Sequence, residues 1–458
     1  MLGFPSRLLM SEDTPNQDPK VKPSTKTAIE LWGLYSYNLH KATYKGLNKL
    51  KGRENKRNFI IGRGSLTGMH RYAGLWTGDN GSSWDFWRIS VAQVIALGYS
   101  GMTIAGVDMG GFTPDPDKEL NPPQWCDPEL LIRWYTGAFL LPWYRNHYIQ
   151  HFGKKNFQEP WQYTYAFQNY SQALQGSSED VYNLYMSVEP ICRYYVQLRY
   201  SLMQVLYDTM FENLINGLPI ARAMLITDPE DTTLFNANDD FIDNQYLLGH
   251  NILVCPVLNP GVNHRPVYLP GSDQWYPLNL RIDVQNQGKD PQRVKHAANL
   301  EQSHYSMYLD DGVSRDSAPA DLPQHRYPHA ATSTTSEAKS YFREVKIHQE
   351  YDGALRIVKL SHPWNLFNAS PLIGDTYQLA LWTEKCTAPS ASDDVSVSFQ
   401  DRDGNSITNS GLTYEYTPSR GVLTVYVPVA LVPNLQNQLP GLVSPEDHFV
   451  SIRVSGLP

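Results

Sequence analysis

The residues with the clearest chemical potential stand at 71–80, where the sequence reads RYAGLWTGDN. An acid, Asp79, follows an aromatic and two small residues, Trp76-Thr77-Gly78. Small residues let a substrate approach the backbone closely. A Trp offers a flat apolar wall to a sugar ring and partly desolvates a neighbouring carboxyl. A carboxyl in such a place can act as a general acid. The alternative, from these ten residues alone, is a glycine-rich turn with a solvated Asp.

Two short apolar stretches end on further polar groups and predict the strands that position them. Residues 58–63, NFIIGR, predict a buried strand that ends on Arg63, and residues 102–108, MTIAGVD, predict a second strand that ends on Asp108. Strands that alternate with helices indicate a parallel α/β sheet or barrel. The carboxyl ends of the strands carry the active sites of (β/α)8 barrels. The expected helices lie at 26–48, 82–97, 128–150 (with a kink at Pro142) and 179–216.

The remainder of the chain predicts a change from α/β to all-β structure. Residues 219–226, PIARAMLI, predict a last barrel strand. Beyond about 245, short β-type runs separated by Gly, Pro and Asn are typical of a β-sandwich. The expected fold is therefore a partial (β/α)8 TIM-type barrel followed by a β-sandwich region. The expected segments are the catalytic barrel part at 1–245, a truncated proximal β-domain at 246–312, a linker or disordered segment at 313–340, and a distal β-sandwich at 341–458.

Composition excludes several classes of function. The net charge of −8 over 458 residues argues against a nucleic-acid partner. No stretch approaches about 18 continuous apolar residues, so no membrane span is expected. The first residues lack a convincing signal peptide, which favours a cytoplasmic over a secreted location. The four cysteines are widely spaced, without a metal-binding pattern, and are expected to be free buried thiols: Cys126, Cys192, Cys255 and Cys386.

Three ordered segments resemble glycoside hydrolase family 31, which includes α-glucosidases, α-xylosidases and α-1,4-glucan lyases. They are NFIIGRGSLTGMHRYAGLWTGDNGSSWDFW, GMTIAGVDMGGF and ELLIRWYTGAFLLPWYRNH. Further segments are most similar to the lyases, among them LWGLYSYNLHKATYKGL, DNQYLLGHNILVCPVL and YLDDGVSRDSAP. The resemblance covers most of residues 1–270 and a patch at 308–320.

The resemblance implies roles for six residues. Asp79 matches the general acid/base of the family. The others match substrate-binding groups: Arg63 an arginine that contacts the sugar, Trp76 a wall of the −1 subsite, Asp108 and His147 hydrogen-bonding partners of the −1 sugar, and Phe112 an apolar rim. The residues alone leave other readings open. Arg63 could pair with Asp108 as a buried ion pair, His147 could cap a helix end, and Trp76 and Phe112 could be core.

The mechanism implied by the resemblance uses two carboxyls about 5–5.5 Å apart across the glycosidic bond. One protonates the leaving oxygen, and the other attacks the anomeric carbon. Water then completes hydrolysis, whereas lyases remove a proton from C2 and release an anhydrofructose. No metal or organic cofactor is implied. The implied partner is an α-1,4-glucan or maltooligosaccharide.

The nucleophilic Asp of the family, in a WxDM-type motif, has no counterpart in this sequence, whose start resembles the stretch just after that motif. None of the early acids ends an apolar strand: Glu12, Asp13, Asp18, Glu30 and Glu54. We therefore expect a catalytically incomplete C-terminal portion of a lyase-type enzyme. The alternatives are an α-glucosidase that hydrolyses terminal glucosyl residues, a non-catalytic carbohydrate-binding remnant, and an inert product that does not fold cooperatively.

Overall fold

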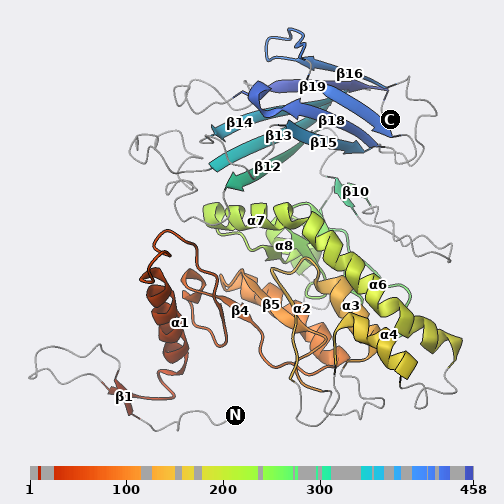
Figure 1. Cartoon of the computed structure of the whole chain (residues 1–458). Coiled ribbons are helices and arrows are strands. Elements are labelled where there is room, and N and C mark those ends of the chain that lie inside the picture. The colour runs from red at the N-terminus through yellow and green to blue at the C-terminus, as the bar shows by residue number, and fades with distance from the viewer. Residues whose placement is uncertain are drawn as a thin grey trace, which may run out of the picture. The chain divides into compact units, whose positions relative to one another are not determined.

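The structure, a computed structural model, falls into two compact units, which are described separately (Figure 1). The first, the α/β unit, comprises Met1–Ser201, Leu218–His250 and Val254–Tyr268. The second, the β-sandwich unit, comprises Leu202–Gly217, Asn251–Leu253 and Leu269–Pro458. The described residues are 9–11, 25–114, 126–149, 157–169, 178–235, 241–271, 274–276, 295–297, 302–310, 342–352, 355–365, 376–382, 395–409, 411–417, 422–433 and 449–456.

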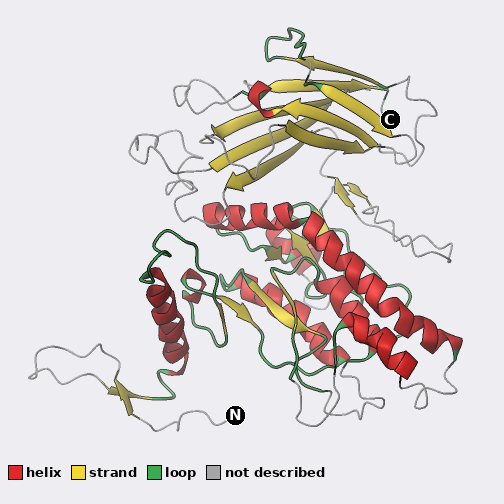
Figure 2. Ribbon diagram, viewed as in Figure 1, coloured by secondary structure: helices red, strands yellow, loops and turns green. Residues whose placement is uncertain are grey.

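The α/β unit is built on a parallel sheet whose strand order is β3-β4-β5-β6 (Figure 2). These strands are β3 (Ile61–Gly62), β4 (Gly74–Trp76), β5 (Ala105–Met109) and β6 (Trp143–Asn146). The helices are α1 (Trp32–Asn48), α2 (Trp84–Tyr99), α3 (Pro128–Ala138), α4 (Pro160–Asn169), α6 (Glu179–Ser201) and α8 (Met224–Thr227). The remaining strands are β1 (Leu9–Ser11), β2 (Thr25–Thr27), β7 (Ala221–Arg222) and β8 (Tyr246–Leu248). Two 3-10 turns lie at Met69–Arg71 and Thr232–Phe235. β9 (Ile252–Val254) stands at the boundary between the units.

The expected partial barrel is confirmed in its parallel α/β character, and the described residues form no closed barrel. Helices α2 and α3 pack on β5, while α6 packs along α3 and α4 (Figure 1). The predicted second helix is confirmed as α2, because the Ser83 side chain accepts a hydrogen bond from the Phe86 backbone N–H and caps its start.

Strand register decides which side chains share a face of the sheet. Paired residues on parallel strands point the same way, and side chains alternate along each strand. Trp76 pairs with Gly106, which pairs with Trp143. Two residues further along, Asp108 pairs with Arg145. These side chains therefore form one face, called here the site face.

A glycine makes the close packing of β5 and β6 possible. A Cβ placed on Gly106 would lie only 2.1 Å from the Trp143 carbonyl oxygen. No side chain fits in that space, so β6 can approach β5 only where residue 106 has none.

Two predicted elements of this unit are wrong. The helix expected at 128–150 ends at Ala138, and residues 143–146 form strand β6 instead. Pro142 lies at this change, where a proline cannot continue helical hydrogen bonding. The last barrel strand expected at 219–226 contains only β7, which pairs antiparallel with β8 outside the parallel sheet. A short apolar run does not reveal its pairing partner.

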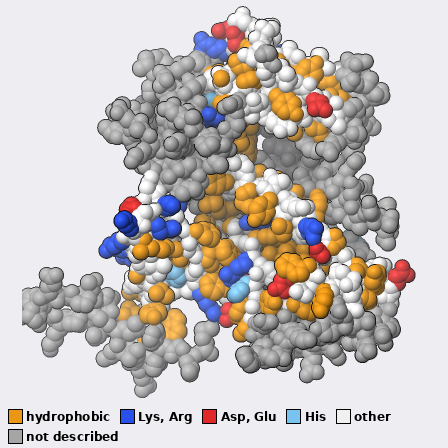
Figure 3. Space-filling view, viewed as in Figure 1, with side chains coloured by type: hydrophobic (Ala, Val, Ile, Leu, Met, Phe, Trp, Pro, Cys, Tyr) orange, Lys and Arg blue, Asp and Glu red, His pale blue; other side chains and the backbone are white. Residues whose placement is uncertain are grey.

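The exterior of the α/β unit carries several uncovered hydrophobic side chains, which Figure 3 shows in orange on the face in view. On α1, Trp32, Tyr35 and Leu39 recur at helical spacing and are all exposed. The inner side of the same helix packs through Tyr37, whose ring meets Tyr72 edge-on. Within the described residues, no helix is both long and apolar enough to cross a membrane.

The β-sandwich unit confirms the predicted all-β region. A five-stranded sheet of order β12-β13-β14-β19-β16 and a three-stranded sheet of order β15-β18-β17 share one apolar core, in which Leu423, Val425 and Ile452 are fully buried. The elements are α7 (Met203–Asn216), β10 (Gln274–Tyr276), β11 (Lys295–Ala297), β12 (Gln302–Asp310), β13 (Phe342–Asp352), β14 (Leu355–Asn365), β15 (Thr376–Trp382), β16 (Ser396–Gln400), β17 (Thr413–Thr417), β18 (Val422–Pro428), a 3-10 turn (Val429–Leu431) and β19 (Val450–Ser455).

Free buried thiols are confirmed at two of the four cysteines, and the predicted linker is not tested. Cys126 and Cys192 are free and buried, and Cys255 is free and half-buried. Cys386 and the linker predicted at 313–340 lie outside the described residues.

Candidate active site

The predicted site residues stand at or just beyond the carboxyl ends of adjacent strands. Arg63 directly follows β3, and Asp79 follows β4 after a tight turn in which Gly78 has a φ of 95°. That conformation strains residues with a Cβ, which accounts for the glycine in WTGDN. Asp108 lies within β5, and His147 directly follows β6. The chain thus brings its candidate groups to one edge of the sheet.

Backbone hydrogen bonds join the three loops that carry these groups. The Phe112 N–H donates to the Asn80 carbonyl oxygen at 2.7 Å, which ties the loop after β5 to the loop after β4. The Ile149 N–H donates to the Phe112 carbonyl oxygen at 2.9 Å, which adds the loop after β6. Gln158, fully buried, donates to the carbonyl oxygens of Met109 and Gly111 and supports the glycine turn between them. The loops therefore hold one another in place without a bound ligand.

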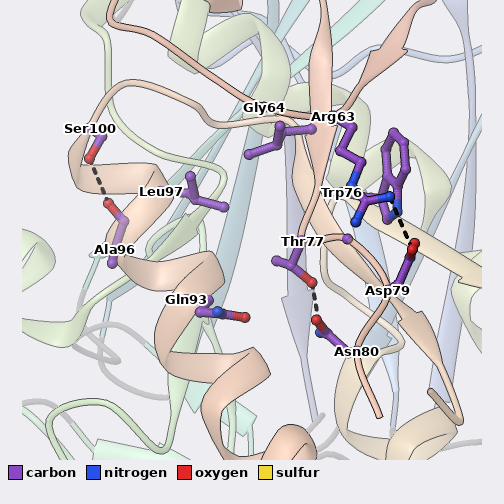
Figure 4. A pocket seen from close by; sticks show the side chains of 12 residues that line it. Arg63, Gly64, Trp76, Thr77, Asp79, Asn80, Gln93, Ala96, Leu97 and Ser100 are labelled. Atoms are coloured by element: carbon purple, nitrogen blue, oxygen red, sulfur yellow. Dashed lines mark hydrogen bonds and ion pairs between the residues drawn. The ribbon is translucent and has the colours of Figure 1, made fainter. Parts of the chain in front are cut away.

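Arg63 and Asp79 form an ion pair at the mouth of the site. Arg63 Nη1 lies 3.0 Å from Asp79 Oδ2, and the side chains are 41% and 31% exposed (Figure 4). The alternative pairing of Arg63 with Asp108 is therefore wrong. Because pairs this exposed contribute about 1 kcal/mol or less, this ion pair can open at small cost.

Asp108 is held instead by Arg145, a residue that sequence analysis missed. Arg145 donates from Nε to Asp108 Oδ1 at 2.8 Å, and its Nη2 lies 2.6 Å from the same oxygen in an ion pair. The Asp108 side chain is fully buried. Burial raises the pKa of Asp108, and the hydrogen bond and positive charge of Arg145 oppose that rise. His147 also lowers the pKa of Asp108 and the charge of Asp79 raises it, so the four groups are electrostatic neighbours.

Aromatic side chains flank these charges. The Arg145 guanidinium lies over the Trp76 ring at 5.5 Å and over the Trp143 ring at 5.1 Å. Phe112 lies beside His147 with ring centroids 5.1 Å apart. Trp76 and Phe112 are half-buried and so not closed into a core, while His147 is exposed and follows a strand. The helix-cap reading of His147 is therefore wrong.

A cavity of about 660 Å³ opens at Asp79 (Figure 4). Three of the predicted residues line it, namely Arg63, Trp76 and Asp79, and the far wall is formed by α2 through Gln93, Ala96 and Leu97. Asp108, Phe112 and His147 do not line this cavity, so the structure brings the six residues together as neighbours but does not enclose them in one pocket.

The acids at the start of the chain do not complete the site where they are described. Glu30 accepts hydrogen bonds from Thr27, and Glu54 is exposed in a turn. Glu12, Asp13 and Asp18 lie outside the described residues. Across the described ranges, no three His, Cys, Asp or Glu side chains gather in a way that could hold a metal ion.

Comparisons with known proteins agree with this arrangement. Residues 5–209 match the "Glycosyl hydrolases family 31 TIM-barrel domain", and residues 217–313 match the "Glycosyl hydrolase family 31 C-terminal domain". The chain is 31% identical to alpha-glucosidase 2 of Bacillus thermoamyloliquefaciens over 253 residues, covering 55% of this chain and 27% of that protein. It is 33% identical to human neutral alpha-glucosidase AB over 249 residues, covering 54% and 22%.

A solved structure with the same fold is the α-1,4-glucan lyase of Gracilariopsis lemaneiformis, with a TM-score of 0.65 at 18% identity, covering 94% of this chain and 42% of that one. The chain thus spans about a quarter of the length of the curated relatives it matches. The two matched domains belong to one family and together take in more than half of the 458 residues. This chain belongs to glycoside hydrolase family 31.

Proposed function

We propose that this chain binds the terminal glucosyl residue of an α-glucan and that Asp79 is placed to donate a proton to the glycosidic oxygen once a second carboxyl completes the site. The observation that carries the proposal is the grouping of Asp79 with Trp76 and Asp108 at one edge of the parallel sheet. An indole wall and a buried carboxylate acceptor are the groups that recognise a sugar ring and its hydroxyls.

In the proposed chemistry, the C1–O bond breaks as Asp79 gives its proton to the leaving oxygen, and a second carboxyl captures C1. The two relatives of similar sequence named above are α-glucosidases, which supports hydrolysis to glucose as the first candidate. The lyase-like sequence segments support elimination to 1,5-anhydrofructose as the second. The identity of the released product distinguishes them.

The chain alone is expected to bind without turnover. A nucleophilic carboxylate must be free to turn toward C1, whereas Asp108 is held by Arg145 through Oδ1. Glu30 is engaged with Thr27. Among the described residues that line the cavity, Asp79 alone carries a carboxyl, so we expect a proton donor and sugar contacts there without a second carboxyl.

Titration calorimetry with maltotriose tests the binding. Trp76→Ala is expected to weaken binding about 10-fold or more, because one aromatic wall is lost. Trp161→Ala is the matched control, since Trp161 is an exposed indole on α4 that does not line the cavity at Asp79. The absence of wild-type binding, or an equal loss in both variants, contradicts the proposal.

A product assay tests the chemistry on maltose and amylose, with glucose and 1,5-anhydrofructose both measured. We expect neither product from the chain alone. Sustained turnover would refute the expected lack of a nucleophile. In that case Asp79→Asn must abolish it, while Asp85→Asn, a change at an exposed acid on α2, must not.

A further inference from the structure

Arg145 connects both aromatic walls and the buried acid of the site face. Its guanidinium bonds Asp108 through two nitrogens and lies over the rings of Trp76 and Trp143. The side chain remains 32% exposed, so it is not simply a core residue. A planar guanidinium can make the forked hydrogen bond and the ring contacts at once, which an ammonium cannot.

The two bonds from Arg145 go to the same carboxylate oxygen and leave the other one open. Nε and Nη2 both reach Oδ1 of Asp108. Oδ2 is buried and has no hydrogen-bond partner within the described structure. An unpartnered buried acceptor is costly, so its retention points to a ligand that supplies the donor. Sugar hydroxyls are donors of the required kind.

We propose that Arg145 is a positioning residue that orients the Asp108 carboxylate, so that Oδ2 meets a substrate hydroxyl beside the Trp76 wall. The proposal rests on the proposed function, because the ligand is taken to be a glucosyl unit. It adds that one arginine fixes the acceptor and the wall together. Loss of Arg145 would therefore disturb both contacts, although Arg145 itself does not need to touch the sugar.

The charges around Asp108 come from three loops. Arg145 and His147 belong to β6 and its extension, and Asp79 belongs to the loop after β4. Among them, Arg145 alone bonds the Asp108 carboxyl within the described structure. Breaking a purely structural ion pair would affect folding stability and the titration of Asp108, but it would not change the sugar affinity of the folded protein.

The test uses the full chain labelled with 13C at aspartate carboxyls, with Asp108→Asn to assign the Asp108 signal. Arg145→Gln is expected to raise the pKa of Asp108 by about one unit or more, because an opposite charge within contact distance is lost. Maltotriose affinity is expected to fall about 10- to 100-fold, as for a lost charge-assisted hydrogen bond. Arg145→Lys is expected to keep part of the effect of a positive charge on the pKa of Asp108. It is not expected to keep the maltotriose affinity, because an ammonium cannot contact the carboxylate through two nitrogens as a guanidinium does. Arg88→Gln, on the surface of α2, is the matched control and is expected to change neither measurement.

The outcomes separate the two ideas. If a folded Arg145 variant keeps the wild-type affinity, the positioning role is overturned, whatever its titration. If wild-type chain binds no maltotriose, the proposed function fails and the sugar-directed part of this inference fails with it. The titration then decides only whether Arg145 and Asp108 are paired in solution. If the Gln variant does not fold, the Lys variant decides both points.

Discussion

A buried acid in the β-sandwich unit allows a prediction whose sign follows from the competition between burial and hydrogen bonding. Asp208, on α7, is 2% exposed. Its carboxylate accepts hydrogen bonds from the Tyr308 backbone N–H and from Gln204 Nε2, each at 2.8 Å, and from the Tyr305 hydroxyl. Phe211, one turn further along α7, stacks on the Tyr308 ring at 5.1 Å. The acid thus fastens α7 to β12.

Burial outweighs the three donors, and the pKa of Asp208 rises from 3.8 to about 6. The folded protein then keeps a proton that the unfolded chain releases between these values. Stability must therefore fall as pH rises through this window. A shift of about two units corresponds to about 3 kcal/mol lost between pH 4 and pH 7. The usual salt-bridged aspartate shows the opposite trend.

Asp208→Asn removes the titration and keeps the shape of the side chain, with one acceptor oxygen for Gln204 and the Tyr308 N–H and an amide group that can donate to the Tyr305 hydroxyl. We expect the variant to gain about 3 kcal/mol relative to wild type as pH rises from 4 to 7. The readout is hydrogen exchange of the 302–310 peptide, because the Tyr308 amide is itself bonded to Asp208. The control is Asp403→Asn, which changes an exposed acid in a turn of the same unit. A wild-type-to-variant difference that does not change with pH, or that changes in the other direction, would show that the donors outweigh burial.

Two further predictions concern the sandwich core and the site face. Burial lowers the pKa of His362 to about 3, so His362 stays neutral in the folded protein while the unfolded chain gains a proton below about pH 6.5. The free energy of unfolding of wild type, measured in urea, should therefore fall by about 1.4 kcal/mol for each pH unit of acidification below 6.5. His362→Gln should remove this dependence on pH. Gly106→Ala should destabilise the α/β unit by about 3 kcal/mol, because the added Cβ meets the Trp143 carbonyl oxygen. Thermal unfolding is the measurement. The control is Gly46→Ala on α1, where nothing lies within 4 Å of the added Cβ and a small gain in stability is expected.

The sequence predicted the strands that have a sufficiently long apolar run and missed those that do not. β5 was expected because MTIAGV is apolar and ends on an acid. β4 has three residues, too few for a recognisable period, and was not identified as a strand. β6 continues directly from an amphipathic helix, so its residues were assigned to that helix. Tertiary pairing with β5, through the space left by Gly106, decides its conformation.

The error over β6 explains which site residue was missed. A helix over 128–150 gives no reason to expect that Arg145 faces Asp108. The sequence analysis therefore weighs Arg63, not Arg145, as the ion-pair partner of Asp108. A signal was present, because Trp143 and Arg145 are two residues apart and would share a face in a strand. Family resemblance found Asp79, Asp108 and His147 without this knowledge, because it compares residue types and does not require the correct strand.

The two ion pairs of the site differ in how readily they can be broken, and this difference fits a binding function. The pair of Arg63 with Asp79 is about one-third exposed, contributes about 1 kcal/mol or less, and can open when a sugar arrives. The pair of Arg145 with Asp108 includes a fully buried carboxyl, and removing one partner from such a pair costs about 3–5 kcal/mol. Under the proposed function, Asp79 can therefore exchange its partner, whereas Asp108 stays part of a fixed framework. If both ion pairs were buried, a sugar could bind only at the cost of breaking one of them. If both were exposed, the site would have no fixed acceptor to orient the sugar.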